Sequence, residues 1–389
     1  MTPQPLEYKI CKRCVMDTSD PDIKFNDKGF CSNCEDVIFA SEHILKNKDG
    51  KGFSLLKQEI DKIKSIQAKE KYDCVIGVSG GVDSSYLCLF LKQFNLRVLA
   101  VHVDAGWNSN ISVSNIKKII EYCNYDFHTH VVNWNTMRRL QIAFLKSGIP
   151  NQDIPQDHVF FAYLYKLALK ENIRYFISGG NYATESILPN SWGNDAMDDV
   201  FIKDVFKKHG SGELIGYELI SFYDYRIKFE LKKFKQLRPL NFITYNKENA
   251  IKELKKIGWK YYEYKHGESF FTNFFQSYIL PNRYGYDKRK AHLSSLIISN
   301  QITREQALRE LSKPLYEKEQ LENDINFFIG KLNISKAEFL SLLSLPKNSY
   351  KNYRNSDFKT KVFNKINYIS KITPKRVLKK IVKIFKFKK

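Results

Sequence analysis

The chain has 389 residues, of which 43% are apolar and 14% aromatic, so it can bury a sizeable core and is long enough for more than one domain. No apolar run approaches the roughly 18 residues of a membrane-spanning helix, and the N-terminus lacks a signal-peptide pattern, which predicts a cytoplasmic protein. The net charge is +21, but residues 347–389 carry 15 Lys or Arg against the single acid Asp357, so the basic character belongs mainly to this tail and does not argue for nucleic-acid binding by the rest of the chain.

Four cysteines near the N-terminus have the spacing C-x2-C-x16-C-x2-C, and they are Cys11, Cys14, Cys31 and Cys34. Each pair fits a tight turn that points two thiolates at one ion, and four thiolates make a closed, structural Zn²⁺ site. Two disulfides are disfavoured in a reducing cytoplasm, whereas an iron–sulfur or redox role stays open. We expect residues 1–48 to form a zinc-knuckle module that is held together mainly by its metal.

The next elements are an amphipathic helix within residues 52–69 and an apolar strand at residues 74–78, followed by a Ser- and Gly-rich turn and another helix. Glycine lets the backbone approach an anion, and the N–H groups at a helix start favour negative charge. The turn has no Gly-Lys-Ser/Thr tripeptide, which argues against a Walker A loop. We therefore predict a phosphate loop, with a plain turn as the alternative, made by Ser79, Gly80, Gly81, Asp83, Ser84 and Ser85.

Strands and helices then alternate, with strands expected at residues 97–104, 127–132 and 173–177 and a helix at 111–122. This alternation predicts a doubly wound parallel α/β sheet over residues 49–258. Ligands of such sheets bind beyond the carboxyl ends of the strands, so we expect Ser79, Asp104 and Ser178 to face one crevice.

The loop sequence Ser-Gly-Gly-Val-Asp-Ser resembles the pyrophosphate loop of the ATP pyrophosphatases, such as NAD synthetase, which cleave ATP to AMP and pyrophosphate. The later segment SGGNYATE resembles the Gly-x-Gly-Asn-x-x-Glu element of NAD synthetase. The resemblance implies that Asp83 and Glu185 hold Mg²⁺ and that Lys247, after an Arg-Pro-Leu segment, stabilises departing pyrophosphate. It also implies nucleotide contacts by Gly179, Gly180 and Asn181, and Asp104 is expected to contact the nucleotide because it lies at a strand end of the same crevice. A capping turn at Glu185 and a solvated lysine at 247 are the alternatives.

Residues 259–297 combine many aromatic side chains with cations, amides and hydroxyls. That mixture suits a pocket in which rings stack on a sugar or base and fixed cations hold an anionic substrate. Within it, His266 and Glu268 are candidates for acid–base catalysis, although a single His is often structural. Amphipathic helices are expected at 303–311 and 317–345, so residues 259–346 are predicted to be a helical substrate-binding region.

Together, CKRC, CSNC, SGGVDSS, VDAGWNS, SGGNYATESILPNSWG, RPLNFITYNK and KHGESFFTNFFQ resemble, in this order, the N-acetyl sugar amidotransferase family of bacterial surface-polysaccharide and nonulosonic-acid pathways. The resemblance implies ATP-dependent conversion of a sugar acetamido group into an acetamidino group. The acetamido oxygen is adenylated, and ammonia then attacks the imidate. Ammonia would come from a separate glutaminase subunit with a cyclase-like partner. The sugar stays open between a nucleotide-linked sugar acid and a nonulosonic acid.

The cysteines agree with an external source of ammonia. An internal glutaminase needs a nucleophilic Cys at the mature N-terminus or on a Gly-x-Cys-x-Gly elbow. Residue 2 is Thr, and Cys74, Cys88 and Cys123 lie in expected strands or helices. The main rival is a tRNA-thiolating enzyme with the same loop, which would need reactive cysteines near the nucleotide. A non-enzymatic binding module would not need a loop, two metal-binding carboxylates and a lysine at one crevice.

The C-terminal residues 347–389 are expected to form a basic linker, up to residue 372, followed by an amphipathic helix over 373–389 with lysines on one face. A basic amphipathic helix can lie on anionic lipid, which predicts peripheral contact with the inner face of the cytoplasmic membrane. Contact with an acidic partner protein and a merely solubilising tail remain alternatives.

Overall fold

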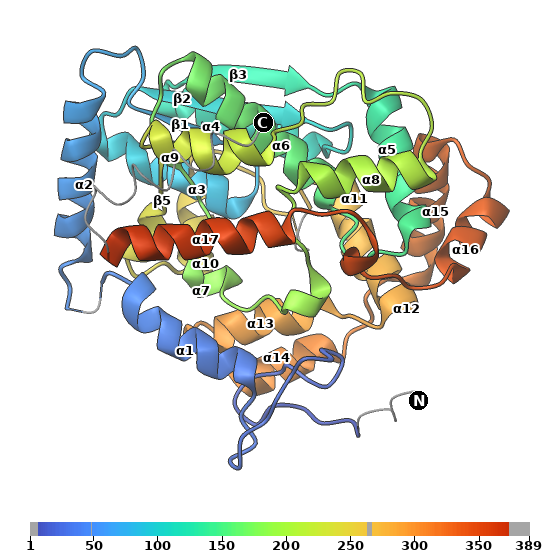
Figure 1. Cartoon of the computed structure of the whole chain (residues 1–389). Helices are drawn as coiled ribbons and strands as arrows, with labels where there is room; N and C mark the ends of the chain where they lie inside the picture. Colours follow the sequence, from blue (N-terminus) through green and yellow to red (C-terminus); the bar gives the residue numbers. More distant parts are fainter. Residues whose placement is uncertain (1–6, 48, 263–266, 373–389) are drawn as a thin grey trace.

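The computed structural model describes residues 7–47, 49–262 and 267–372 (Figure 1). Two predictions, the acid–base role of His266 and the tail helix at 373–389, therefore lie outside the described residues. Within the described ranges, no helix is both long enough and apolar enough to cross a membrane.

The predicted parallel sheet is confirmed. Its five strands are all parallel and lie in the order β3-β2-β1-β4-β5. Their bounds are Cys74–Gly77 for β1, Val98–Asp104 for β2, Asp126–Val131 for β3, Tyr175–Ile177 for β4 and Lys235–Leu237 for β5. Along the chain, β2 and β3 are added to the sheet on one side of β1, and β4 and β5 are then added on the other side. The switch point between β1 and β4 is where such sheets open a crevice for ligands.

Both faces of the sheet are covered by helices (Figure 1). Successive side chains of β1 point to opposite faces, so each face needs its own core. Cys74 and Ile76 point into one core, which is completed by α2 (Gly52–Ile66), α3 (Val82–Leu91), α4 (Asn110–Cys123) and α10 (Lys247–Lys256). Val75 points into the opposite core with α5 (Trp134–Ser147), α6 (Ile154–Lys170) and α8 (Asp199–His209). The domain is thus doubly wound.

A third core, rich in phenylalanine, forms the helical region at the right of Figure 1. It contains α11 (Phe270–Phe274), α12 (Leu280–Tyr284), α15 (Lys318–Leu332) and α16 (Lys336–Ser344). This core also takes in Trp107 from the loop after β2 and Leu145 from α5, so the helical region is fused to the sheet domain. The expected helix at 317–345 is broken at Asn333, which adopts a left-handed conformation at φ 53°.

The N-terminal module, with α1 (Ser32–Ile44), lies below the sheet domain in Figure 1, beside α13 (Lys288–Ile298) and α14 (Arg304–Leu311). The Arg304 guanidinium donates to the carbonyls of Cys11 and Cys14, each at 3.0 Å. Buried Asp17 forms an ion pair with Lys290 of α13. These contacts attach the cysteine-bearing turns to the C-terminal helices.

The linker expected at residues 347–372 is not present, because this stretch packs on the sheet domain and then forms α17 (Asp357–Ile372). Tyr350 and Tyr353 are both buried in the core that contains α8. Their hydroxyls donate to the carboxylate of Asp198 and, at 2.8 Å, to the carbonyl of Ser147. Composition alone gave the wrong result because two buried tyrosines can anchor an otherwise basic segment.

Candidate active site

The loop after β1 has the geometry of an anion site. Gly80 has φ +79°, a conformation that favours glycine, and a Cβ there would lie 2.5 Å from the Ser112 carbonyl oxygen. Gly81 is the N-cap of α3, so the loop ends on the N-terminus of a ten-residue helix. The Ser84 hydroxyl accepts a hydrogen bond of 3.3 Å from the N–H of Ser79, which closes the loop. Ser79 itself is exposed.

The second glycine-rich turn, after β4, packs directly on this loop. A Cβ on Gly179 would lie 2.8 Å from the carbonyl oxygen of Asp83, so only glycine allows the two backbones to approach this closely. Asn181 is buried and caps α7 (Tyr182–Glu185): its Oδ1 accepts from the Thr184 N–H at 3.0 Å. Asn181 therefore organises the turn. A Cβ on Gly180 would lie 3.8 Å from a carboxylate oxygen of Glu185 and 4.0 Å from Arg238 Nε.

The two carboxylates predicted to hold Mg²⁺ share one neighbour, Tyr245. The Tyr245 hydroxyl donates a hydrogen bond to Asp83 Oδ1. Burial, followed by the charge of Asp83 and more weakly that of Glu185, raises the pKa of Tyr245 far above its ordinary value. Asp83 contacts the second glycine-rich turn at Gly179, and a Glu185 carboxylate oxygen lies beside Gly180 of the same turn, so both residues lie where the two turns pack together. Two carboxylates beside a phosphate site are a donor set that fits Mg²⁺.

Lys247 is the first residue of α10, which packs against α3, the helix that carries Asp83. Its N–H donates to Gln301 Oε1 at 3.0 Å. The side chain is half-buried and forms no ion pair within the described ranges. The sequence had singled out Lys247 but not Tyr245 two residues earlier, because a tyrosine in an aromatic-rich chain carries no distinctive signal.

Asp104 ends β2 and organises the following turn, since its Oδ1 accepts from the Gly106 N–H at 2.7 Å. That turn carries Asn108, which forms an isolated antiparallel bridge with Ser269. Nearby His102 is buried between the Val78 carbonyl and Asn108, each at 2.8 Å, and burial lowers its pKa. His102 is therefore a neutral support of the crevice wall.

Glu268 reaches the phosphate loop. A Cβ on Gly81 would lie 3.3 Å from Glu268 Oε1 and 3.3 Å from the hydroxyl of Tyr262. Burial raises the pKa of Tyr262 well above its ordinary value, and the charge of Glu268 adds to this effect. A carboxylate at an anion-binding loop opposes phosphate unless a proton or a cation lies between them. The position of Glu268 is thus compatible with the predicted acid–base role.

A polar cluster continues from Glu268 towards the N-terminus of α6. The Thr272 hydroxyl donates at 3.0 Å to Oδ1 of buried Asp153, and Gln276 donates to its Oδ2 at 3.3 Å. One turn further along α6, burial and the neighbouring charge of Asp153 raise the pKa of Asp157 to about 8, against the opposing effect of Lys288. No sequence pattern singles out these two acids, because Asp at a helix start usually serves as a cap.

The four N-terminal cysteines are buried and converge. Their sulfurs lie within 4.8 Å of one another, with 3.9 Å between Cys11 and Cys34 and 3.5 Å between Cys14 and Cys31. A tetrahedral site with metal–sulfur bonds of about 2.3 Å requires sulfurs roughly 3.8 Å apart. Backbone N–H groups of Cys14 and Cys31 point at Cys11 Sγ, which stabilises a thiolate there. The residues fit a four-thiolate metal ion.

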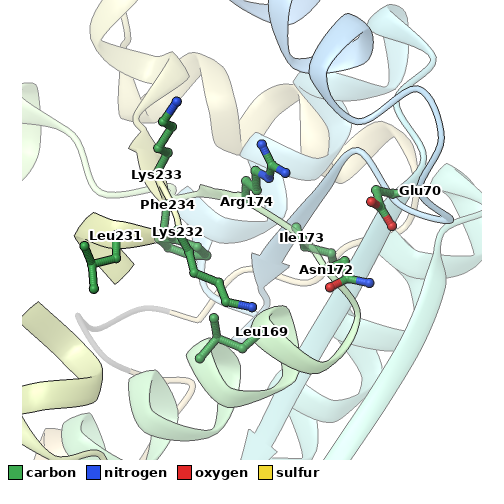
Figure 2. A pocket seen from close by; sticks show the side chains of 9 residues that line it. All are labelled: Glu70, Leu169, Asn172, Ile173, Arg174, Leu231, Lys232, Lys233 and Phe234. Atoms are coloured by element: carbon green, nitrogen blue, oxygen red, sulfur yellow. The ribbon is translucent and has the colours of Figure 1, made fainter. Parts of the chain in front are cut away.

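A separate cavity of about 430 Å³ lies at the amino ends of β4 and β5 (Figure 2). Lys232 extends across it above Leu169, and Arg174 and Lys233 lie on the far side from Leu169. It occupies the end of the sheet opposite the phosphate loop, so it takes no part in the candidate active site.

Comparison with known proteins supports part of the expected identity. Residues 268–367 match the family of the C-terminal domain of WbpG-like LPS biosynthesis proteins. The match begins at Glu268, and it confirms the resemblance to bacterial surface-polysaccharide enzymes over this segment. No curated protein sequence matches the chain.

Two solved structures are similar in part. An NH3-dependent NAD synthetase from Campylobacter jejuni subsp. jejuni NCTC 11168, in complex with the nitrate ion, is 14% identical over 54% of this chain and 98% of its own, with a TM-score of 0.27. The U34-tRNA thiolase NcsA from Methanococcus maripaludis, with its iron–sulfur cluster, is 14% identical over 79% of this chain and 89% of its own, with a TM-score of 0.31. Likenesses at this level assign no activity.

Proposed function

We propose that this protein is an ATP-dependent amidotransferase of lipopolysaccharide O-antigen or nonulosonic-acid biosynthesis, which converts a sugar acetamido group into an acetamidino group. One observation carries the proposal. The loop after β1, which carries Asp83, packs on the second glycine turn, which precedes Glu185, at the switch point of the sheet, and the segment matching a lipopolysaccharide biosynthesis domain begins at Glu268, against that loop.

The chemistry explains the need for ATP. An amide oxygen is a very poor leaving group, and transfer of AMP to it gives an imidate ester from which AMP departs when ammonia adds. The loop N–H groups and Lys247 would stabilise charge on pyrophosphate as the bond to the α-phosphate breaks. Bound Mg²⁺, held by Asp83 and Glu185, would supply Lewis-acid neutralisation of the phosphates. Glu268 would accept a proton from the added ammonia, so that the neutral amine displaces AMP.

The nitrogen source is proposed to be a glutaminase subunit that works with a cyclase-like subunit. The three cysteines outside the N-terminal cluster are buried, and burial raises the pKa of Cys74 and Cys88 well above the ordinary thiol value. Such thiols are poor nucleophiles. The same burial opposes the rival assignment as a tRNA-thiolating enzyme, which requires reactive cysteines beside the nucleotide.

The proposal is tested by following ATP labelled in the α-phosphate in the presence of Mg²⁺, ammonium chloride and UDP-linked diacetamido hexuronic acid. We expect labelled AMP from the unaltered protein and a loss of at least about 100-fold in Asp83→Asn. Asp61→Asn, at an exposed position on α2, is the matched control and should retain full activity. Formation of ADP, or equal rates for Asp83→Asn and the unaltered protein, would refute the assignment.

A further inference from the structure

Tyr245 contacts a group that the proposed chemistry needs. It lies in the turn before α10, is 5% exposed, and directs its hydroxyl at Asp83 in the first turn of α3. Its ring packs against Tyr86, with the ring centroids 5.6 Å apart. The hydroxyl is thus delivered to the Asp83 carboxylate by a side chain that has little room to move.

The backbone of Tyr245 is held by the segment that matches the lipopolysaccharide biosynthesis domain. Gln301 Nε2 donates to the Tyr245 carbonyl at 3.5 Å and Gln301 Oε1 accepts from the Lys247 N–H at 3.0 Å. The same Nε2 donates at 3.2 Å to the Ser299 hydroxyl, which donates at 2.7 Å to the Ala183 carbonyl in α7, the helix that ends at Glu185. One hydrogen-bonded set therefore joins the turn of Tyr245, the start of α10 and the helix of Glu185.

We propose that Tyr245 is a positioning residue for the divalent cation of the nucleotide site: its hydroxyl fixes the orientation of the Asp83 carboxylate, one of the two groups proposed to hold that cation. This inference rests on the proposed function, since it assumes that Asp83 and Glu185 hold the cation that accompanies ATP.

The physical reason lies in the carboxylate. A carboxylate accepts hydrogen bonds at two oxygens with about four lone-pair sites, so a donor at Oδ1 is compatible with ligation of a metal by the same group. A fixed carboxylate loses less rotational freedom when a cation binds. Partners that orient metal ligands in this way typically contribute about 10- to 100-fold in metal affinity. If the hydroxyl instead competed with the cation for the carboxylate, its removal would raise the metal affinity.

The test measures Mn²⁺ affinity in the presence of ATP by electron paramagnetic resonance, for the full chain and for Tyr245→Phe, which removes only the hydroxyl. Tyr86→Phe is the matched control, because no hydrogen bond of the Tyr86 hydroxyl occurs within the described ranges. Equilibrium dialysis with ATP and EDTA measures nucleotide binding without metal. Gln301→Met is a second variant, which loosens the turn without touching the hydroxyl.

We expect the Mn²⁺ dissociation constant to rise about 10-fold in Tyr245→Phe and to rise also in Gln301→Met. It should stay within about twofold of the original in Tyr86→Phe, with metal-free ATP binding the same in Tyr245→Phe, Tyr86→Phe and the unaltered protein. An unchanged or tighter Mn²⁺ affinity in Tyr245→Phe would overturn the positioning role while leaving the proposed function intact. Failure of the unaltered protein to bind ATP and Mn²⁺ would instead overturn the nucleotide site, and the positioning role with it.

Discussion

Asp157 combines an acidic side chain with surroundings that favour its neutral form. Its pKa is raised to about 8 by burial and by Asp153, so the folded protein keeps this proton to about pH 8, whereas the unfolded chain loses it near pH 4. A folded state that binds more protons loses stability as pH rises, here between about pH 4 and 8. Replacing Asp157 with Asn should therefore stabilise the protein at pH 9, by an amount that shrinks as pH falls towards 5.

Urea unfolding at pH 5, 7 and 9 measures this difference, with Asp61→Asn as an exposed control that should show no trend. Loss of stability at pH 9 in Asp157→Asn would contradict the assigned environment.

Functional residues differ in how clearly a local sequence pattern predicts them. Asp83 and Gly179 lie in short glycine-rich patterns that resemble nucleotide-binding turns, and in the structure these two turns are in contact. Asp153 and Tyr245 act through contacts with residues 119 and 162 positions away in the chain. No local sequence pattern predicts hydrogen bonds between residues so far apart in the chain, and only the folded structure shows them.

At the scale of elements, the two glycine-rich turns depend on close backbone contact. A Cβ at Gly179 would lie 2.8 Å from Asp83 O and 3.0 Å from Ser84 N, and these are backbone atoms that cannot rotate away. We expect Gly179→Ala to displace the phosphate loop, to cost about 1–3 kcal/mol of stability and to weaken ATP binding. Isothermal titration with ATP and thermal melting measure the two effects.

Gly330→Ala is the control for this substitution, because no heavy atom lies within 4 Å of a Cβ there, in the last turn of α15. That variant should not lose stability, since alanine suits a helix better than glycine, and it should bind ATP normally. Normal ATP binding by Gly179→Ala would show that the turns do not need their close packing.

Elements with strong local patterns were predicted well. β1, β2 and β4 are short apolar runs, and the helix at 52–69 repeats its apolar residues with helical spacing. The edge strand β5 has the sequence Lys-Gln-Leu and exists because it pairs with β4, which no window of its own sequence could indicate. The buried tyrosines at 350 and 353 were missed for the same reason.

At the scale of the whole molecule, the cysteine module is connected to the candidate active site through α13. Lys290 pairs with Asp17, and the Ser294 hydroxyl accepts from the Val15 N–H at 3.1 Å. The next residue of α13, Ser295, supports the turn after α7, because its hydroxyl accepts from the Ile187 N–H at 2.9 Å. A metal ion at the cysteines should therefore stabilise the region that holds Glu185.

We expect elemental analysis to find one zinc ion per chain, and Cys14→Ser to lose the metal, lower the melting temperature and weaken Mg²⁺–ATP binding. A visible absorption band of an iron–sulfur cluster, or an unaltered melting temperature in Cys14→Ser, would contradict a structural zinc site.

The central claim is that this chain activates a sugar amide oxygen with AMP so that ammonia can replace it. The most direct measurement is mass spectrometry of diacetamido sugar acids incubated with the protein, ATP, Mg²⁺ and ammonium. We expect AMP, pyrophosphate and a sugar in which one oxygen has been exchanged for NH. An unchanged sugar alongside ADP and phosphate would contradict it.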